Sequence, residues 1–383
     1  MTSIWSFPTR VIFGQGAAQE LGSEAKRLGA KHALLVSDPG VAGAGILDGI
    51  GESLQAAGLG VTRYTDVSGN PLEAEVLGAT DAYRDSGADL IVGVGGGSAL
   101  DVAKLVRVLA THPPPLAQYD DAKGGDALIT EDVPPMIALP TTAGTGSEVG
   151  RSGVVTIEAT NKKTVIFAPK LMPNVAILDP MLTVSLPPRA TAATGFDALT
   201  HCIEAYCAKG HHPMADAIAL EGVRLVVAHI ETAVHDGKDL KARGAMLEAA
   251  MMGATAFQKG LGACHSLAHP LSAETGMHHG LANALCLPAV LDFNRQAVPE
   301  RIAAIARILG ARGDDVETLA FECSGAVKAL RRKLGLPDGL AAEGISEDDL
   351  PRLAELAILD ACHAMNPREC VAEDMLALFR ASL

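Results

Sequence analysis

An aspartate and a histidine lie four residues apart in the stretch GFDALTHCIEAY, which covers residues 195–206. The stretch has the composition of a helix, so Asp197 and His201 would project from one face, about one turn apart. Carboxylates and neutral imidazoles are ligands that divalent transition metals such as zinc and iron accept. The pair is therefore a candidate half of a metal site.

Further histidines occur later in the chain, in the stretches HSLAH and MHHG. His265 and His269 would again lie one helical turn apart, and His278 and His279 are adjacent. His265 and His279 could complete a four-ligand site. In the alternative interpretation, these are packing or surface histidines, because this spacing also arises by chance. Spacing alone supports the two interpretations about equally, and the absence of an HExxH motif excludes the zinc-protease arrangement.

A glycine-rich turn occurs in VGVGGGSALDVAK, residues 92–104. A strand-like run leads into Gly96, Gly97 and Ser98, and a helical pattern follows. Glycines allow close approach of a ligand to the backbone, and the free N–H groups at a helix start suit a pyrophosphate. The spacing is not GxGxxG, so a simple tight turn is the alternative.

A hydroxyl-rich loop occurs in LPTTAGTGSEV, residues 139–149. Thr141, Thr142 and Thr145 could donate hydrogen bonds to phosphate or ribose oxygens. A polar surface loop is an equally good interpretation, because Ser, Thr and Gly are common in loops.

The bulk properties exclude several classes of protein. The chain has 383 residues, 48% of them hydrophobic, and a formal net charge of -14 from 31 basic and 45 acidic residues. This balance argues against nucleic acid and anionic membranes as partners. No apolar run is long enough for a membrane span, and the first residues do not resemble a signal peptide. Seven scattered cysteines without a CxxC pair favour free thiols, so we expect a cytoplasmic protein.

The first half of the chain alternates between strand-like and helical patterns, whereas the second half is helical throughout. Alternation of this kind predicts a Rossmann-like α/β domain with a mostly parallel sheet. We place the boundary at Pro187-Pro188, which predicts an α/β domain over 1–187 and an all-helical domain over 188–383. The predicted strands lie within 32–38, 60–67, 88–97, 134–142 and 174–179. Predicted helices of the second half cover 191–208, 213–235, 239–257, 300–309, 316–334 and 347–364.

These motifs together resemble the iron-containing (group III) alcohol dehydrogenases, including the lactaldehyde reductase and propanediol dehydrogenase types. The matching stretches occur in the order of the family and span nearly the whole chain. They are GGGSALDVAK, LPTTAGTGSEV, NVAILDP, LPPRATAATGFDALTHCIEAY, HSLAHPLSAETGMHHGLANALCLP and MNPRE. The resemblance implies an α/β dinucleotide-binding domain followed by a helical metal-binding domain.

The resemblance also implies roles for the histidines. The metal ligands would be Asp197, His201, His265 and His279, because the family ligand directly precedes Gly in the HHG motif. The expected ion is Fe(II), with zinc as an alternative, acting as a Lewis acid on the substrate oxygen. His269 matches a position that lines the reaction cleft, so we expect it to act catalytically by moving a proton.

The resemblance implies NAD as the cofactor. Asp38 falls where the family meets the adenosine ribose, and a carboxylate there would repel the 2′-phosphate of NADP. The remaining cofactor positions implied by the family are Asn70, Gly96, Gly97, Ser98, Asp101, Thr141, Thr142, Thr145, Lys163 and Leu182.

The expected activity is NAD-dependent, metal-dependent hydride transfer between a small alcohol, diol or hydroxyaldehyde and its oxidised or reduced partner, in a homodimer or larger homo-oligomer. The segment QKGLGAC before His265 is one residue shorter than in some members, and because it borders the substrate cleft of the family, we expect the substrate of this chain to differ from theirs. One alternative is a lyase resembling dehydroquinate synthase, although few Lys or Arg residues surround Asp197 and His265 to bind its phosphorylated substrate. A non-catalytic nucleotide-binding module is the other, and the complete ligand set argues against it.

Overall fold

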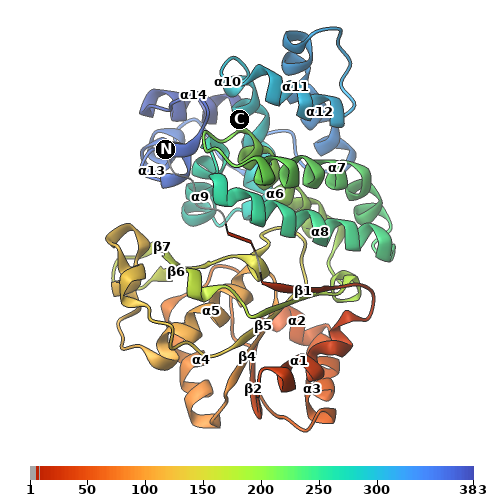
Figure 1. The fold of residues 1–383 in the computed structure, drawn as a ribbon. Helices are drawn as coiled ribbons and strands as arrows, with labels where there is room; N and C mark the ends of the chain where they lie inside the picture. Colours follow the sequence, from red (N-terminus) through yellow and green to blue (C-terminus); the bar gives the residue numbers. More distant parts are fainter. Residues whose placement is uncertain (1–5, 8) are drawn as a thin grey trace. The chain divides into compact units, whose positions relative to one another are not determined.

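A computed structural model describes residues 6, 7 and 9–383. The chain forms two compact units (Figure 1). One comprises Phe7–Thr142 and Gly146–Ser185, and the other comprises Leu186–Leu383 with the short segment Ala143–Thr145. The change from one unit to the other follows the change in sequence texture near residue 187, because the β-branched runs end there.

The first unit is built around a six-stranded parallel sheet in the order β1-β8-β5-β4-β2-β3, so the predicted α/β class is confirmed. Its strands are β1 (Arg10–Phe13), β2 (His32–Val36), β3 (Gly60–Tyr64), β4 (Leu90–Gly95), β5 (Met136–Pro140) and β8 (Val175–Leu178). Its helices are α1 (Leu21–Arg27), α2 (Pro39–Gly43), α3 (Ile46–Ala56), α4 (Glu73–Ser86) and α5 (Gly97–Thr111).

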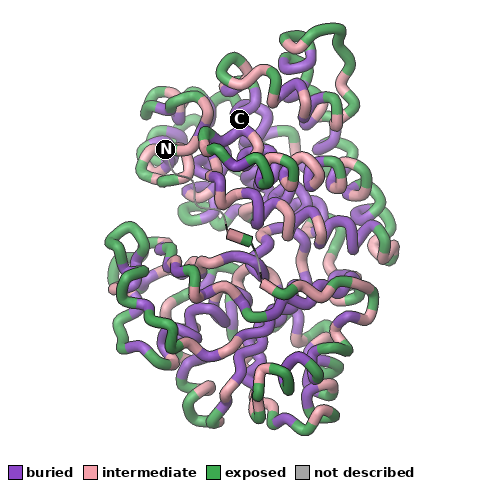
Figure 2. Tube along the Cα trace, in the orientation of Figure 1, coloured by how far each residue is buried: buried purple, intermediate pink, exposed green. Residues whose placement is uncertain are grey.

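Helices cover both faces of this sheet. Successive side chains of a strand point to opposite faces, so a strand can contribute to a hydrophobic core on either side. Leu34 of β2 belongs to a core that includes Val76 of α4 and Leu100 of α5. Its neighbour Leu35 belongs to a second core with Leu47 of α3 on the opposite face. Because both faces are packed, the central strand β4 is buried along its whole length (Figure 2).

Two features of this unit differ from the sequence prediction. Strand β1 pairs in parallel with β8 at one edge of the sheet, where the sequence patterns predict no strand. An antiparallel hairpin of β6 (Ser152–Ile157) and β7 (Lys162–Phe167) forms a separate two-stranded sheet. The hairpin connection contains Asn161 with φ 48°, a left-handed conformation that Asn tolerates in turns.

The second unit is helical, as predicted (Figure 1). Its helices are α6 (Pro188–Cys207), α7 (Pro213–His235), α8 (Leu240–Ala256), α9 (Ala263–Thr275), α10 (His279–Asn294), α11 (Pro299–Ile308), α12 (Val316–Lys333), α13 (Leu350–Ala357) and α14 (Ala372–Ser382). Helix α6 is buried on nearly all sides and contacts α7, α8 and α10. Among the described residues, no helix is both long and apolar enough to cross a membrane.

The helix predicted over 347–364 is wrong in its second half, because α13 ends at Ala357. Asp360 has an extended backbone, and its side chain accepts a hydrogen bond from the Cys362 amide at 2.9 Å. A short carboxylate that bonds to nearby backbone groups favours a cap or turn over a continuing helix. The remaining residues therefore form a short 3-10 helix over Ala361–Met365.

Candidate metal centre and dinucleotide site

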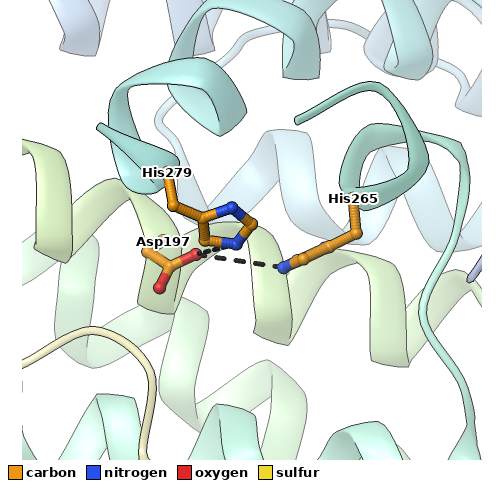
Figure 3. A group of neighbouring side chains, drawn as sticks. All are labelled: Asp197, His265 and His279. Carbon is orange, nitrogen blue, oxygen red and sulfur yellow. Dashed lines mark ion pairs between the residues drawn. The ribbon is translucent and has the colours of Figure 1, made fainter. Parts of the chain in front are cut away.

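Three of the predicted ligands converge in the helical unit. Asp197 comes from α6, His265 from the first turn of α9 and His279 from the first turn of α10 (Figure 3). Their ligand atoms all lie within 4.8 Å of one another. The Asp197 Oδ1 atom is 3.9 Å from His265 Nε2 and 3.5 Å from His279 Nε2.

His201 lies beside this group, one turn after Asp197 on α6. Its Nε2 is 3.9 Å from Asp197 Oδ1, and its ring stacks on that of His265 with centroids 4.6 Å apart. The group whose ligand atoms all lie within 4.8 Å of one another nevertheless consists of Asp197, His265 and His279. Of the adjacent pair, His279 reaches Asp197, whereas His278 is exposed at the N-cap of α10.

The residues present fit a divalent metal. Donors about 2.0–2.2 Å from one tetrahedral ion lie about 3.3–3.6 Å from each other, close to the separations seen here. Burial alone would raise the pKa of Asp197, but three neighbouring imidazoles and the Asn283 amide outweigh burial and lower it to about 2. Burial lowers the pKa of His201 to about 4. The carboxylate is therefore ionised and the His201 imidazole neutral at pH 7, which are the forms that bind metals.

Sequence reasoning missed two side chains that contact these residues. The Asn283 Nδ2 atom donates to Asp197 Oδ1 at 2.9 Å and lies 3.2 Å from His279 Nε2. Asn283 follows His279 by one turn of α10, so helical spacing could have found it. The Glu204 carboxylate accepts a hydrogen bond from His265 Nδ1 at 2.5 Å. It follows His201 by three residues, on the same face of α6.

The predicted catalytic residue, His269, is held by a carboxylate. Its Nδ1 atom is 2.7 Å from Asp360 Oδ2, and its ring stacks on His279 with centroids 5.2 Å apart. Burial would raise the pKa of Asp360, but hydrogen bonding and the charge of His269 lower it. An ionised Asp360 can only accept, so Nδ1 carries a proton and Nε2 is the nitrogen that can exchange one.

The predicted cofactor residues of the α/β unit gather at the carboxyl ends of adjacent strands. Asp38 follows β2, Gly96 and Gly97 follow β4, and Thr141 follows β5. The chain leaves β2 toward β3 and returns on the other side of β2 as β4, so these residues flank a topological switch point. Dinucleotides bind at such points in open parallel sheets.

The glycine turn has the geometry of an anion site. Gly96 is the N-cap of α5, a helix of 15 residues, so the first N–H groups of the helix follow the turn directly. Thr142 adjoins it, because a Cβ added to Gly96 would lie 3.4 Å from the Thr142 side chain. Ser98 donates from Oγ to Gly69 O at 2.8 Å, next to the exposed Asn70.

The other predicted cofactor residues lie on several different elements. The carboxylate of Asp101 accepts from Ser147 Oγ and from Val154 N, so both of its oxygens bond within the protein. Lys163 lies on β7, and Leu182 lies in the 3-10 helix after β8 and packs on the sheet. Thr145 belongs to the short segment grouped with the helical unit.

Comparison with known proteins places both halves of the chain in the same protein family. Residues 8–180 match the family described as iron-containing alcohol dehydrogenase, and residues 191–383 match the C-terminal part of that family. The chain is 41% identical to 4-hydroxybutyrate dehydrogenase of Cupriavidus necator, with 98% of each chain covered.

Solved structures are similar over the whole length as well. The crystal structure of a 1,3-propanediol oxidoreductase has a TM-score of 0.96 and 37% identity, with 100% of each chain covered. Sulfoacetaldehyde reductase from Bifidobacterium kashiwanohense, solved in complex with NAD+, has a TM-score of 0.89 and 30% identity. The comparison covers 100% of this chain and 98% of that one.

Proposed function

This chain belongs to the iron-containing alcohol dehydrogenase family, and we propose that it interconverts short primary alcohols and aldehydes with NAD and a divalent metal. The observation that carries the proposal is the convergence of Asp197, His265 and His279 within 4.8 Å in the helical unit (Figure 3). A lyase of the dehydroquinate synthase type is not favoured by this family membership.

Each proposed residue has a defined task. Asp197, His201, His265 and His279 would hold Fe(II) or Zn(II), which supplies a Lewis acid that polarises a carbonyl and lowers the pKa of an alcohol. The switch point of the α/β unit would hold NAD, which accepts or supplies the hydride. His269 would give a proton from Nε2 during aldehyde reduction and take one during alcohol oxidation, while Asp360 fixes Nδ1.

The names of two similar proteins suggest the substrate class. One acts on 4-hydroxybutyrate and the other on 1,3-propanediol. Both compounds have a primary alcohol at one end and a second polar group at the other. We therefore propose a short primary alcohol with a second polar terminus as the substrate of this chain.

A substrate panel tests the proposal. The protein is loaded in turn with Fe(II) and Zn(II) and assayed by NADH absorbance with ethanol, 1-butanol, 1,3-propanediol, 1,4-butanediol and 4-hydroxybutyrate. The expected result is a higher kcat/KM for the substrates with two polar ends than for 1-butanol. If no alcohol and no matching aldehyde changes the NADH absorbance, the dehydrogenase proposal fails.

We also propose a cytoplasmic homodimer in which 1–187 binds the dinucleotide and 188–383 binds the metal. All seven cysteines are free, which suits a reducing compartment. Light scattering coupled to size-exclusion chromatography would measure the oligomeric state, and a monomer would contradict the dimer.

A further inference from the structure

Glu204 is a buried carboxylate that the proposed reaction does not use. Its side chain is 4% exposed, and among the described residues its ion-pair partner is His265 rather than a lysine or arginine. Burying a carboxylate without strong partners is costly. The contacts that compensate this cost therefore indicate what the residue does.

Among the described residues, the hydrogen bonds of the Glu204 side chain are to the first turn of α9. Glu204 Oε1 accepts from the Cys264 backbone N–H at 2.6 Å, and Oε2 accepts from the His265 backbone N–H at 3.4 Å. Oε2 also accepts from the His265 ring at Nδ1, at 2.5 Å. One carboxylate therefore holds both the backbone and the imidazole of a proposed ligand.

The position of Glu204 on α6 places it behind the ligands. Asp197, His201 and Glu204 are spaced by four and then three residues, so they share one helix face. Gly262, just before α9, leaves room for the carboxylate, because a Cβ there would lie 2.8 Å from Glu204 Oε1. The packing of α6 and the start of α9 thus keeps this carboxylate against His265.

The hydrogen bond selects which nitrogen of His265 faces inward. An ionised carboxylate can only accept, so the proton of a neutral His265 ring resides on Nδ1. Nε2 then presents its lone pair toward Asp197 Oδ1, 3.9 Å away. The Asn283 amide, 3.4 Å from His265 Nε2, also approaches this nitrogen as a donor.

We propose that Glu204 is a positioning residue of the metal centre, which fixes the His265 ring with Nε2 directed at the ion and thereby sets the affinity for a divalent cation. This inference rests on the proposed metal function of the site. Carboxylates that hold a ligating histidine in this way typically contribute about 10- to 100-fold to metal affinity.

The test is Zn(II) affinity, measured by competition with a chromophoric chelator on the full-length protein. Glu204→Gln keeps the side-chain shape but removes the charge. It also places an amide N–H donor next to the N–H groups that donate to Glu204 in the wild type. We expect Zn(II) binding weaker by about 10- to 100-fold, and a changed visible spectrum of the Co(II)-substituted protein. Affinity within twofold of the wild type would overturn the proposal.

A matched control separates positioning from general stability. Asp239 caps α8 by accepting from the Ala242 N–H at 2.9 Å, so Asp239→Ala removes a helix cap from the same unit without touching the proposed ligands. It should lower the melting temperature of the metal-free protein without changing Zn(II) affinity. An equal loss of affinity in this control would assign the effect of Glu204→Gln to stability and overturn the inference.

Two further outcomes are decisive. If Glu204→Gln does not fold, Glu204→Asp carries the test, since it keeps the charge but withdraws the carboxylate from Nδ1. Wild-type Zn(II) affinity in that variant would overturn the positioning role. If the wild-type protein itself binds neither Zn(II) nor Fe(II), the proposed function fails first and this inference fails with it.

Discussion

At the scale of single residues, His269 combines accessibility with a fixed orientation. Its side chain is 34% exposed, while Nδ1 is held by Asp360. The proposed ligand His265 is only 2% exposed, so the two histidines of the HSLAH motif differ in environment as well as in proposed role. A proton-transferring group needs access to substrate or solvent, whereas a ligand needs burial and fixed geometry.

This difference gives the first prediction. His269→Ala should lower kcat by about 100- to 10,000-fold, the usual contribution of a general acid or base. The metal content should remain that of the wild type, as measured by inductively coupled plasma mass spectrometry. The exposed His211 of the same unit provides the control, and His211→Ala should change neither quantity. Loss of metal from His269→Ala would mean that His269 is a ligand.

Asp38 supports a second prediction, about cofactor choice. Its Oδ1 atom caps α2 by accepting from the Val41 N–H at 2.9 Å, so one carboxylate has both a structural and a proposed recognition role. Asp38→Asn keeps an acceptor for this cap but removes the charge that would repel a 2′-phosphate. The ratio of kcat/KM for NADP to that for NAD should rise by about tenfold or more.

The control for this prediction is Asp38→Ala, which removes both the charge and the cap. It should shift cofactor preference in the same direction and in addition lose about 1 kcal/mol of stability, measured by chemical denaturation. An unchanged NADP-to-NAD ratio in Asp38→Asn would exclude Asp38 from the ribose site.

At the scale of elements, the metal centre depends on how closely α10 approaches α6. Gly280 is the second residue of α10, and a Cβ there would lie 2.1 Å from the Ala193 carbonyl oxygen of α6. No side chain fits in that space, so the two helices must separate to admit one. His279, the adjacent residue, would then move away from Asp197.

Gly280→Ala should therefore lower both stability and Zn(II) affinity. We expect a loss of about 1–3 kcal/mol in the free energy of unfolding, as for other overpacked sites. Gly325 of α12 is the matched control, because an added Cβ meets no atom within 4 Å and the residue is exposed. Gly325→Ala should stabilise the protein by about 0.5–1 kcal/mol. Equal effects of the two substitutions would contradict the close approach of α6 and α10.

The sequence predicted elements better than it predicted their long-range contacts. Local periodicity was sufficient for β2, β3, β4, β5 and β8 and for most helices of the second half. Strand β1 was missed because it is both short, with four residues, and without a buried position that would mark it as part of the core. The pairing of His269 with Asp360 spans 91 residues, and no local pattern indicates that these two side chains meet. The hairpin of β6 and β7 did have a local signal, a β-branched run with a turn at Asn161.

At the scale of the whole molecule, the buried charges of the α/β unit affect how stability depends on pH. Burial raises the pKa of Glu148 to about 7 and lowers that of Lys104 to about 8. Lys104 donates to Ser147 Oγ at 2.6 Å and to Ser152 O at 2.8 Å, which ties α5 to the start of β6. The two groups change the free energy of unfolding in different pH ranges. The range for Lys104 lies between about 8, its pKa in the folded protein, and 10.5, the ordinary pKa of Lys.

Glu148 therefore gives a prediction for the pH range from about 4.5 to 7. In that range the unfolded carboxyl has lost its proton while the folded one keeps it, so the folded state binds more protons and stability falls as pH rises. The full effect is about 3 kcal/mol at most. Glu148→Gln cannot ionise, so its stability relative to the wild type should increase with pH across this range, as followed by thermal melting. The exposed Glu52 is the control, and Glu52→Gln should track the wild type at every pH. Parallel pH profiles for wild type and Glu148→Gln would show that Glu148 is ionised in the folded protein at pH 5, with Lys104 stabilising its charge.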